Sequence, residues 1–257
     1  MQPIKAALQA ANAANQLLLK NFHKLHKQDY QAKSAHELVT STDRACNLLI
    51  QKILKKHFPG IGVISEEGHN RPSRLHWIID PLDGTTNFVL HIPFFGVSIA
   101  LADGNDILFG IITCPATGEK FIAARGHGAE KNGKALKLNS AKPLNQTIIG
   151  YGYSHSAKSL HASLVLAEKL SSQVRAVRHS GSTALDMAYL AAGRLDAVII
   201  ANPVNIWDVA AGIIIVKEAG GAVLDQFGKT WINENSDLYA GQTKILAKLR
   251  PYAKYCK

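Results

Sequence analysis

The chain has 257 residues, 47% of them hydrophobic, which is enough to bury a substantial core in one large domain or two small ones. No apolar run reaches the ~18 residues needed to cross a bilayer, the N-terminal residues carry no apolar signal segment, and three widely separated cysteines exclude a disulfide framework or a thiolate metal site. We therefore expect a cytoplasmic protein without membrane contact.

The charge balance is strongly basic, with a formal net charge of +10. A basic surface attracts phosphorylated metabolites or nucleic acid, but solvated lysines also serve solubility. The lysines stand in small clusters, and the chain has no aromatic-rich basic motif of the RNA-recognition type. We favour the solvated surface, and nucleic-acid binding stays open as an alternative.

The N-terminal part of the chain has apolar residues at helical spacing. The pattern predicts a helix over residues 3–27 and another over residues 42–57, with Asp43 close to the start of the second. His23 and His26 are three positions apart and suit a shared metal ion by spacing alone. Their lysine-rich surroundings favour a solvent-facing helix instead.

The next segment places carboxylates at the ends of short strands. Residues 61–64 predict a strand that leads directly into Glu66, and residues 69–75 predict a polar loop. The apolar residues 77–79 predict a buried strand that ends on Asp80 and Asp83. Two carboxylates there are costly unless something positive lies between them. We expect the Pro-Leu dipeptide between them to turn the chain, so that both face one point.

The residues that follow these aspartates suit the binding of an anion. Gly84 allows a sharp turn or a close approach to a ligand. Residues 85–87, Thr-Thr-Asn, are candidate caps of a helix whose first N–H groups are free to bind an anion. Carboxylates for a hard cation beside donors for a phosphate predict a metal-assisted phosphoryl site. The alternative is an ordinary surface turn.

The middle of the chain is predicted to be an antiparallel meander. Its expected strands cover residues 95–102, 107–114 and 120–124. Turn dipeptides separate the strands or close a hairpin after them: Asp103-Gly104, Thr117-Gly118 and Asn132-Gly133.

The pattern changes after about residue 140, where strands alternate with helices. The expected strands cover residues 147–153, 174–179 and 197–201, and the expected helices cover residues 160–170 and 183–192. We place a soft boundary there. Residues 1–139 then form an α+β half that carries most of the candidate metal ligands, and residues 140–257 form an α/β half of the same compact fold.

Several acidic residues fall at the ends of predicted elements, namely Asp43, Glu66, Glu67 and Asp208. Aspartate at a helix start is also a favoured cap, and two adjacent glutamates also suit a solvated loop. Taken together, however, these carboxylates lie where ligand sites of α/β folds form. Because no paired histidine or cysteine accompanies them, oxygen-only ligation points to Mg²⁺ or a similar hard ion.

These segments resemble the inositol monophosphatase family, within the lithium-sensitive, Mg²⁺-dependent phosphatase superfamily. The segments that carry the resemblance are Ser65-Glu66-Glu67, residues 77–88 and Trp207-Asp208-Val209-Ala210-Ala211-Gly212, supported by residues 38–43 and 181–187. The resemblance implies a layered α/β fold, the αβαβα sandwich of the inositol monophosphatase and fructose-1,6-bisphosphatase type. It also implies hydrolysis of a small phosphorylated metabolite and a homodimer.

The resemblance also implies a set of metal ligands for two or three Mg²⁺ ions. Glu66, Asp80 and the backbone carbonyl of Leu82 would hold one ion. Asp80, Asp83 and Asp208 would hold a second. A weaker third ion would rest on Glu66 and water.

The substrate side of the site follows from the same resemblance. Gly84 and Thr85 would give backbone N–H groups to the phosphate. Thr85, paired with Asp43, would orient or deprotonate the attacking water, with Glu66 as a further catalytic residue. Lys33 matches a family lysine near the site. The substrate side is completed by Asp208 and by the loop that faces the leaving group, which is Gly181, Ser182 and Thr183.

One departure from the family concerns the substrate. Inositol-preferring members usually place a glutamate several residues before the Trp-Asp pair, whereas residues 201–206 contain no acid and make the segment one residue longer. This leaves the metal site intact and the substrate open among inositol phosphates, fructose 1,6-bisphosphate, 3′-phosphoadenosine 5′-phosphate and histidinol phosphate. Asn202 or Asn205 is a candidate contact for such a leaving group, or simply a turn residue.

The sequence therefore predicts a Mg²⁺-dependent phosphomonoesterase that activates water on a metal. The alternative from another class is a regulatory protein that binds RNA or the transcription machinery, as some bacterial relatives do.

Overall fold

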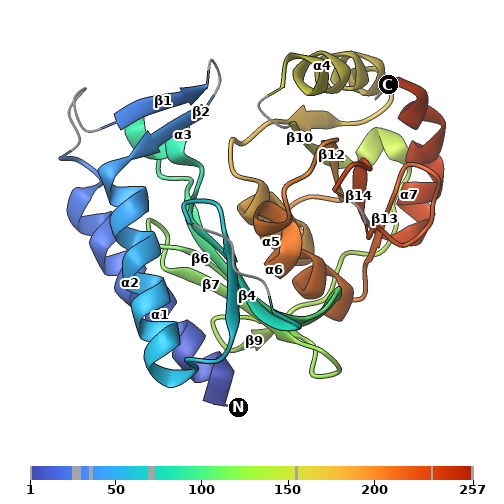
Figure 1. Ribbon diagram of the computed structural model, residues 1–257. Coiled ribbons are helices and arrows are strands. Elements are labelled where there is room, and N and C mark those ends of the chain that lie inside the picture. Colours follow the sequence, from blue (N-terminus) through green and yellow to red (C-terminus); the bar gives the residue numbers. More distant parts are fainter. Residues whose placement is uncertain are drawn as a thin grey trace.

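The computed structural model describes residues 2–24, 30–34, 37–68, 73–153, 156–232 and 234–255. Its helices and large sheets alternate in the order α–β–α–β–α, which confirms the predicted layered sandwich (Figure 1). His26, Cys256 and most of the predicted loop over 69–75 lie outside the described residues. No helix within the described ranges is long and apolar enough to cross a membrane.

The first layer is a helix pair, α1 (Gln2–Asn21) and α2 (Ser41–His57). The predicted helix over 3–27 was too long, because Phe22 leaves the helical path. Its ring packs 4.6 Å from that of Phe95, centre to centre, and its carbonyl oxygen lies 2.6 Å from Nδ1 of His91. His23 is exposed, as expected, but it lies in the turn after the helix.

The second layer is a 7-stranded sheet in the order β3-β4-β5-β6-β7-β8-β9. Its strands are β3 (Gly62–Ser65), β4 (Leu75–Asp83), β5 (Gly96–Asp103), β6 (Asp106–Cys114), β7 (Glu119–Ala124), β8 (Ala129–Lys131) and β9 (Lys134–Ala135). β3 and β4 are parallel and the other neighbours antiparallel, so the predicted meander is confirmed. A small sheet of β1 (Tyr30–Ser34) and β2 (Glu37–Thr40) stands beside it.

The strand that carries the aspartates is longer than predicted. β4 does not turn at the Pro-Leu dipeptide but runs on to Asp83, with a register shift against β5 between Asp80 and Asp83. An irregularity of this kind bends a strand locally and re-aims its side chains. The register shift therefore takes the place of the turn that was predicted at the Pro-Leu dipeptide. The short helix α3 (Thr85–Val89) begins directly after Gly84.

The second large sheet has five strands in the order β11-β10-β12-β14-β13. Its strands are β10 (Ile148–Tyr153), β11 (Ala176–Arg178), β12 (Ala197–Ala201), β13 (Ala222–Leu224) and β14 (Leu238–Gly241). Its helices are α4 (Ala157–Ser171), α5 (Thr183–Ala191), α6 (Ile206–Glu218) and α7 (Thr243–Leu249), with short 3₁₀ turns η2 (Leu144–Gln146) and η3 (Arg250–Tyr255). The antiparallel pairs formed by β13 and β14 were not predicted.

The layering follows from the alternation of apolar side chains along the strands. Ile79, Ile99 and Ile111 lie in a cluster with α1 and α2, whereas their chain neighbours such as Ile78 and Ile112 lie in a cluster with α5, α6 and the second sheet. The opposite face of the second sheet packs on α4 and α7. The central helices thus connect the two large sheets through one shared core.

α6 lies unusually close to the first sheet. A Cβ atom at Gly110 of β6 would lie 2.6 Å from Cα of Ala211 and 2.7 Å from Cγ2 of Ile214. Residues 209–216 of this helix are all buried. Glycine at this position therefore lets the backbone of the helix approach the sheet.

The substitution Gly110→Ala tests this contact. We expect it to lower the free energy of unfolding by about 2–3 kcal/mol, because the added methyl group must displace helix backbone rather than a flexible side chain. Urea unfolding measures the effect. Gly60→Ala is the matched control, since nothing lies within 4 Å of a Cβ atom there, and its effect is expected to stay within about 0.5 kcal/mol. Equal losses in the two variants would contradict the close approach.

Candidate active site

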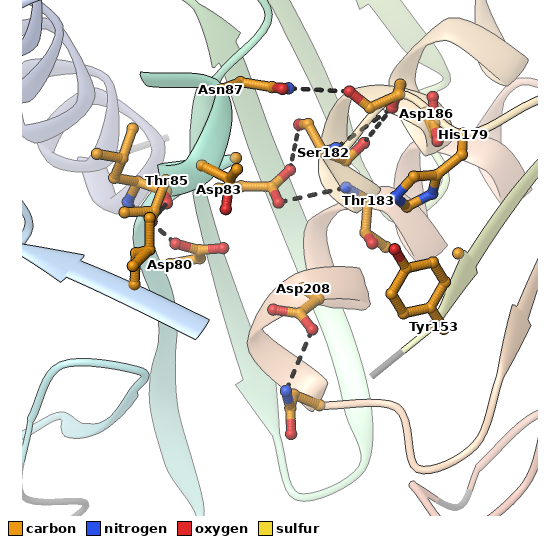
Figure 2. Close-up of a pocket in the computed structure, with 18 of the residues that line it drawn as sticks. Asp80, Asp83, Thr85, Asn87, Tyr153, His179, Ser182, Thr183, Asp186 and Asp208 are labelled. Carbon is orange, nitrogen blue, oxygen red and sulfur yellow. Dashed lines mark hydrogen bonds between the residues drawn. The ribbon is translucent and has the colours of Figure 1, made fainter. Parts of the chain in front are cut away.

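A cavity of about 530 Å³ brings together segments that are far apart in the sequence (Figure 2). The candidate metal ligands Glu66, Asp80, Asp83 and Asp208 all line it. They come from the end of β3, the end of β4 and the first turn of α6. The start of α3, the start of α5 and the end of β10 complete the walls.

Asp83 connects the first sheet to α5. Its carboxylate accepts hydrogen bonds from Ser182 Oγ (2.5 Å), Thr183 N (3.2 Å) and Ala184 N (2.7 Å). Burial raises the pKa of Asp83 to about 6, and hydrogen bonds from Ser182, Ala184, Thr183 and Leu185 act against that rise.

Asp80 lies in a cluster of like charges. Burial raises its pKa well above the usual value, and the carboxylates of Glu66, Asp83 and Asp208 raise it further. The described residues that line the cavity include no lysine or arginine. Buried carboxylates that repel one another are stabilised by protons or cations that neutralise them. The donor set, oxygen atoms alone, fits Mg²⁺ or a similar hard cation.

The carboxylates share the cavity without forming a tight coordination sphere. Among the described residues, no group of three or more histidine, cysteine, aspartate or glutamate side chains is placed to hold a metal ion. Asp83 is turned towards α5, and Oδ1 of Asp80 accepts a hydrogen bond from the N–H of Leu82 (3.0 Å). The metal-ligand set therefore stays a prediction.

Thr85 and Asp43 form the predicted pair. Thr85 Oγ1 lies 2.9 Å from Asp43 Oδ1 and 3.0 Å from the carbonyl oxygen of Leu82. A hydroxyl donates to one acceptor at a time. The other oxygen of Asp43 accepts from the N–H and the hydroxyl of Thr40 in a capping box at the start of α2. The N-cap of α2 is thus Thr40 rather than Asp43, which is the N3 residue of this capping box and also binds Thr85. Burial raises its pKa, and the bonds from Thr40 and Thr85 oppose the rise.

The N-cap of α3 is Gly84, so the prediction that a threonine or asparagine caps this helix was wrong. Gly84 has φ = 86° and provides no side-chain cap. This conformation favours glycine, and a Cβ atom there would lie 3.0 Å from the carbonyl oxygen of Phe94. Thr85 is thus the first residue of the helix, which leaves its N–H without an intrahelical partner.

Asn87 connects α3 to the loop before α5, a role that sequence reasoning missed. Its Nδ2 donates to the carbonyl oxygens of Phe94 (2.7 Å) and Ser180 (2.9 Å). Gly181 lies against it, because a Cβ atom at that position would be 3.0 Å from Asn87 Nδ2. The only signal in the sequence was the position of Asn87 within the acidic segment.

The two asparagines in the segment before α6 have different contacts. Asn202 is bound by Asp237, whose Oδ1 accepts from its backbone N–H and its side-chain amide. Asn205 lines the cavity, and its Nδ2 donates to Asp208 Oδ2 (3.3 Å). Asp208 is in the first turn of α6, but the N-cap is Asn205. Capping is therefore not the role of Asp208.

For the remaining predicted residues, the structure gives the position of some side chains and not of others. Gly181, Ser182 and Thr183 line the cavity, and the hydroxyl of Ser182 is occupied by Asp83. The backbone of Lys33 belongs to β1, and its side chain lies outside the described part. The carbonyl of Glu67 accepts from Asn47 Nδ2 (2.7 Å), so this glutamate is anchored to α2.

The cavity has further lining residues that were not predicted, among them Asp186, Tyr151, Tyr153 and His179. Burial raises the pKa of Asp186 to about 7, with a smaller contribution from Asp83, while a hydrogen bond with Ser180 opposes the rise. The Gly-Tyr-Gly-Tyr alternation in β10 was a usable signal. Alternate residues of a strand share a face, so both tyrosines had to point the same way.

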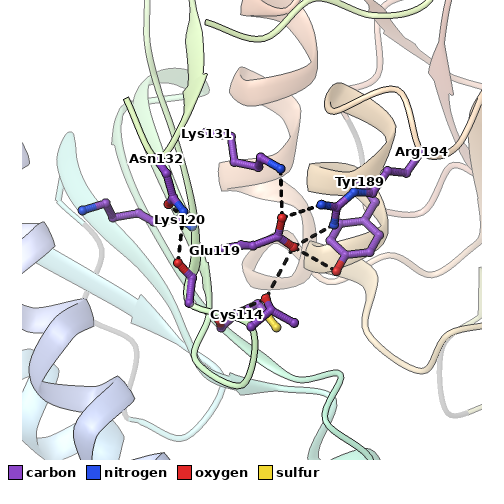
Figure 3. Close-up of polar contacts among 9 residues, drawn as sticks. Cys114, Glu119, Lys120, Lys131, Asn132, Tyr189 and Arg194 are labelled. Atoms are coloured by element: carbon purple, nitrogen blue, oxygen red, sulfur yellow. Dashed lines mark hydrogen bonds and ion pairs between the residues drawn. The ribbon is translucent and has the colours of Figure 1, made fainter. Parts of the chain in front are cut away.

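A partly buried ion-pair network fixes the other end of α5 to the first sheet (Figure 3). Glu119 of β7 binds the Arg194 guanidinium with both oxygens (2.5 and 2.7 Å) and also accepts from Lys131 Nζ (3.0 Å) and Tyr189 Oη (3.1 Å). The Arg194 side chain holds the pKa of Glu119 down at about 2, helped by Lys131 and Tyr189 and opposed by burial. The helix that holds Asp83 is thus anchored at both ends.

The substitution Glu119→Gln tests this anchor. At neutral pH we expect the free energy of unfolding to fall by about 1–2 kcal/mol, because Gln cannot form the bidentate pair. A depressed carboxyl pKa contributes stability that is present above the unfolded value and lost on acidification. The difference from the parent protein should therefore shrink as the pH falls from about 4.5 towards 2.

Urea unfolding at several pH values measures this difference. Glu168→Gln is the control, since Glu168 pairs with Lys169 on the surface with 69% of its side chain exposed, and it should change stability by less than about 0.5 kcal/mol. A pH-independent loss in Glu119→Gln would contradict the electrostatic explanation.

Comparisons with known proteins agree with the fold. The inositol monophosphatase family model matches residues 1–254. The chain is 37% identical over 246 residues to inositol-1-monophosphatase of Mesorhizobium japonicum, covering 94% of this chain and 92% of that protein. It is 36% identical over 255 residues to Nus factor SuhB of Xylella fastidiosa, covering 96% and 92%. The crystal structure of extragenic suppressor protein suhB from Bartonella henselae superposes with a TM-score of 0.91 at 35% identity, covering 99% of each chain. The chain therefore belongs to the inositol monophosphatase family.

Proposed function

We propose that this protein hydrolyses a small phosphate monoester with the help of Mg²⁺. The observation that carries the proposal is the cavity in which Glu66, Asp80, Asp83 and Asp208 meet beside the Thr85–Asp43 pair. Membership of the inositol monophosphatase family supports phosphatase activity. A dianionic ester can enter this acidic cavity only together with cations that neutralise the carboxylates.

The side chains suit attack by water on the phosphorus atom. Mg²⁺ held by Glu66, Asp80, Asp83 and Asp208 would lower the pKa of water and offset the charge of the phosphoryl group. The Thr85 hydroxyl donates a hydrogen bond to Asp43 Oδ1, so a lone pair of the hydroxyl oxygen can accept from the attacking water and orient it. The free N–H groups at the start of α3 hold the phosphoryl oxygens.

Release of inorganic phosphate tests the proposal directly. The substrates are inositol monophosphates, sugar bisphosphates, nucleotide bisphosphates and histidinol phosphate, each with Mg²⁺, with a chelator, and with Mg²⁺ plus lithium. We expect release from at least one ester, loss of release with the chelator and inhibition by lithium. No release above the blank from any ester would refute the proposal.

A second candidate function is favoured by the +10 charge and by relatives named Nus factor SuhB. It is a regulatory role through binding of RNA or the transcription machinery. Filter binding of RNA at increasing salt tests it, because neutralised phosphates give a steep decrease of affinity with salt. Salt-sensitive RNA binding without turnover of any ester would make this the better proposal.

A further inference from the structure

We propose that an aromatic wall of the cavity, made of Tyr151, Tyr153 and His179, binds a planar heteroaromatic ring of the substrate. The phosphate ester then carries a ring such as a nucleobase or an imidazole on its alcohol. This inference rests on the proposed function and adds a substrate class to it. The aromatic wall is defined by these three residues, all of which line the cavity.

The three side chains of the wall contact one another. The rings of Tyr153 and His179 lie 4.7 Å apart, centre to centre, at 20° to one another, and the Tyr151 ring lies 5.3 Å from the same imidazole. Nδ1 of His179 also lies 3.1 Å from the carbonyl oxygen of Tyr151. Figure 2 shows Tyr153 and His179 on the side of the cavity formed by the second half of the chain.

Local sequence explains why the stack forms. The tyrosines alternate with glycines in β10, so both side chains lie on one face of this strand. His179 follows directly after β11, the parallel neighbour of β10. The tyrosines are half-buried and the imidazole is exposed. The stack therefore presents aromatic surface to a ligand without first having to order its own side chains.

The wall shares one cavity with the candidate metal site. Thr183 and Asp83 line the same cavity as the three rings. The N–H of Thr183 donates to Asp83 Oδ1 at 3.2 Å. A phosphate ester whose phosphoryl group lies at the carboxylates therefore has the aromatic wall within the same cavity for its leaving group.

The chemistry of this side of the cavity favours a ring over a second phosphate. Stacking of a base on an aromatic side chain contributes about 1–3 kcal/mol. The cavity residues that the structure describes provide no lysine or arginine, so they offer a second phosphate no positive partner. Residues 201–206, on the way to Asp208, provide no carboxylate to bind a polyol hydroxyl either. The lack of a lysine or arginine thus favours a ring-bearing monoester over a sugar bisphosphate.

The test compares matched substrates that differ only in the ring. The first pair is adenosine 5′-monophosphate and ribose 5-phosphate, and the second is histidinol phosphate and 2-aminopropyl phosphate. With Mg²⁺, we expect kcat/KM for one ring-bearing ester to exceed that of its ringless partner at least about tenfold. The pair with the larger ratio shows whether the preferred ring is a nucleobase or an imidazole. Ratios near one in both pairs, or a higher kcat/KM for inositol 1-phosphate, would overturn the proposal.

Variants connect that preference to the wall. Tyr153→Leu is expected to lower the ring-to-ringless ratio about tenfold, whereas Tyr153→Phe, which keeps the ring and loses only the hydroxyl, should preserve it. Tyr255→Leu, in η3 and absent from the cavity lining, is the matched control. A ratio that Tyr153→Leu does not change would assign the ring to another part of the cavity and refute the wall.

Binding without phosphate separates this inference from the proposed function. Adenosine against ribose, and histidinol against 2-amino-1-propanol, are compared by ligand-detected NMR titration. If no ester is hydrolysed, the phosphatase proposal fails, yet tighter binding of the ring-bearing member, lost in Tyr153→Leu, still supports the wall. Equal binding in both pairs refutes the wall even if the protein proves to be a phosphatase.

Discussion

Asp83→Asn is expected to lower kcat for Mg²⁺-dependent phosphate release by about 1,000-fold or more, while the protein remains folded. Asparagine retains one oxygen but presents an amide group in place of the second. The lost oxygen is either Oδ2, which accepts from Ser182 Oγ and Ala184 N, or Oδ1, which accepts from Thr183 N. A charge that the reaction needs therefore disappears, and an N–H donor of α5 loses its acceptor.

Phosphate release and urea unfolding together separate the two effects of this substitution. We expect the free energy of unfolding to fall by only about 1–3 kcal/mol, the cost of an unsatisfied buried donor. Asp225→Asn is the control, because Asp225 Oδ1 also accepts backbone N–H groups, from Phe227 and Lys229, but lies outside the cavity. Full activity in Asp83→Asn would end the metal-ligand assignment of this residue.

Thr85→Val is expected to reduce kcat about 100-fold with little change in KM. Valine keeps the shape and the backbone N–H of threonine, so phosphate binding at the start of α3 is preserved. It removes the hydroxyl that lies 2.9 Å from Asp43 Oδ1. Thr85→Ser restores the hydroxyl and should recover most of the rate.

A double-mutant cycle shows whether Thr85 and Asp43 act together. Asp43→Asn alone should lower kcat by a similar factor, and the combination with Thr85→Val should cost little more than either change. The control for stability is the urea midpoint of each variant, because Asp43 is also part of the capping box of α2. Independent, multiplying losses would show that the two residues do not share one function.

The sequence predicted much of the fold because its strands alternate cleanly between the two cores, as in Ile78 and Ile79 of β4. It did not predict where α1 ends, because a tertiary contact of Phe22 with Phe95 interrupts a helical pattern that continues in the sequence. It also missed β14, since a four-residue strand flanked by polar residues has too short a pattern to recognise.

The candidate site shows the same division. The candidate metal ligands Glu66, Asp80, Asp83 and Asp208 were visible, because each stands at an end of a recognisable element, whereas Asp186 was missed. Hydrogen bonds that span about 100 residues, such as Ser182 to Asp83, leave no trace in local sequence. The shift in β4 was likewise hidden, because Pro81 and Leu82 suit a turn as well as an irregular strand. The contacts that join the two halves of the chain could therefore be identified only from the three-dimensional structure.

The burial of α6 has a consequence for how the protein works. This helix carries Asp208 in its first turn. Gly110 brings the helix into backbone contact with the first sheet, and the same core continues into the second sheet. A hinge between the sheets would have to break that contact, and packed interiors do not deform gradually. We therefore expect small molecules to enter and leave the cavity without one half of the chain swinging against the other.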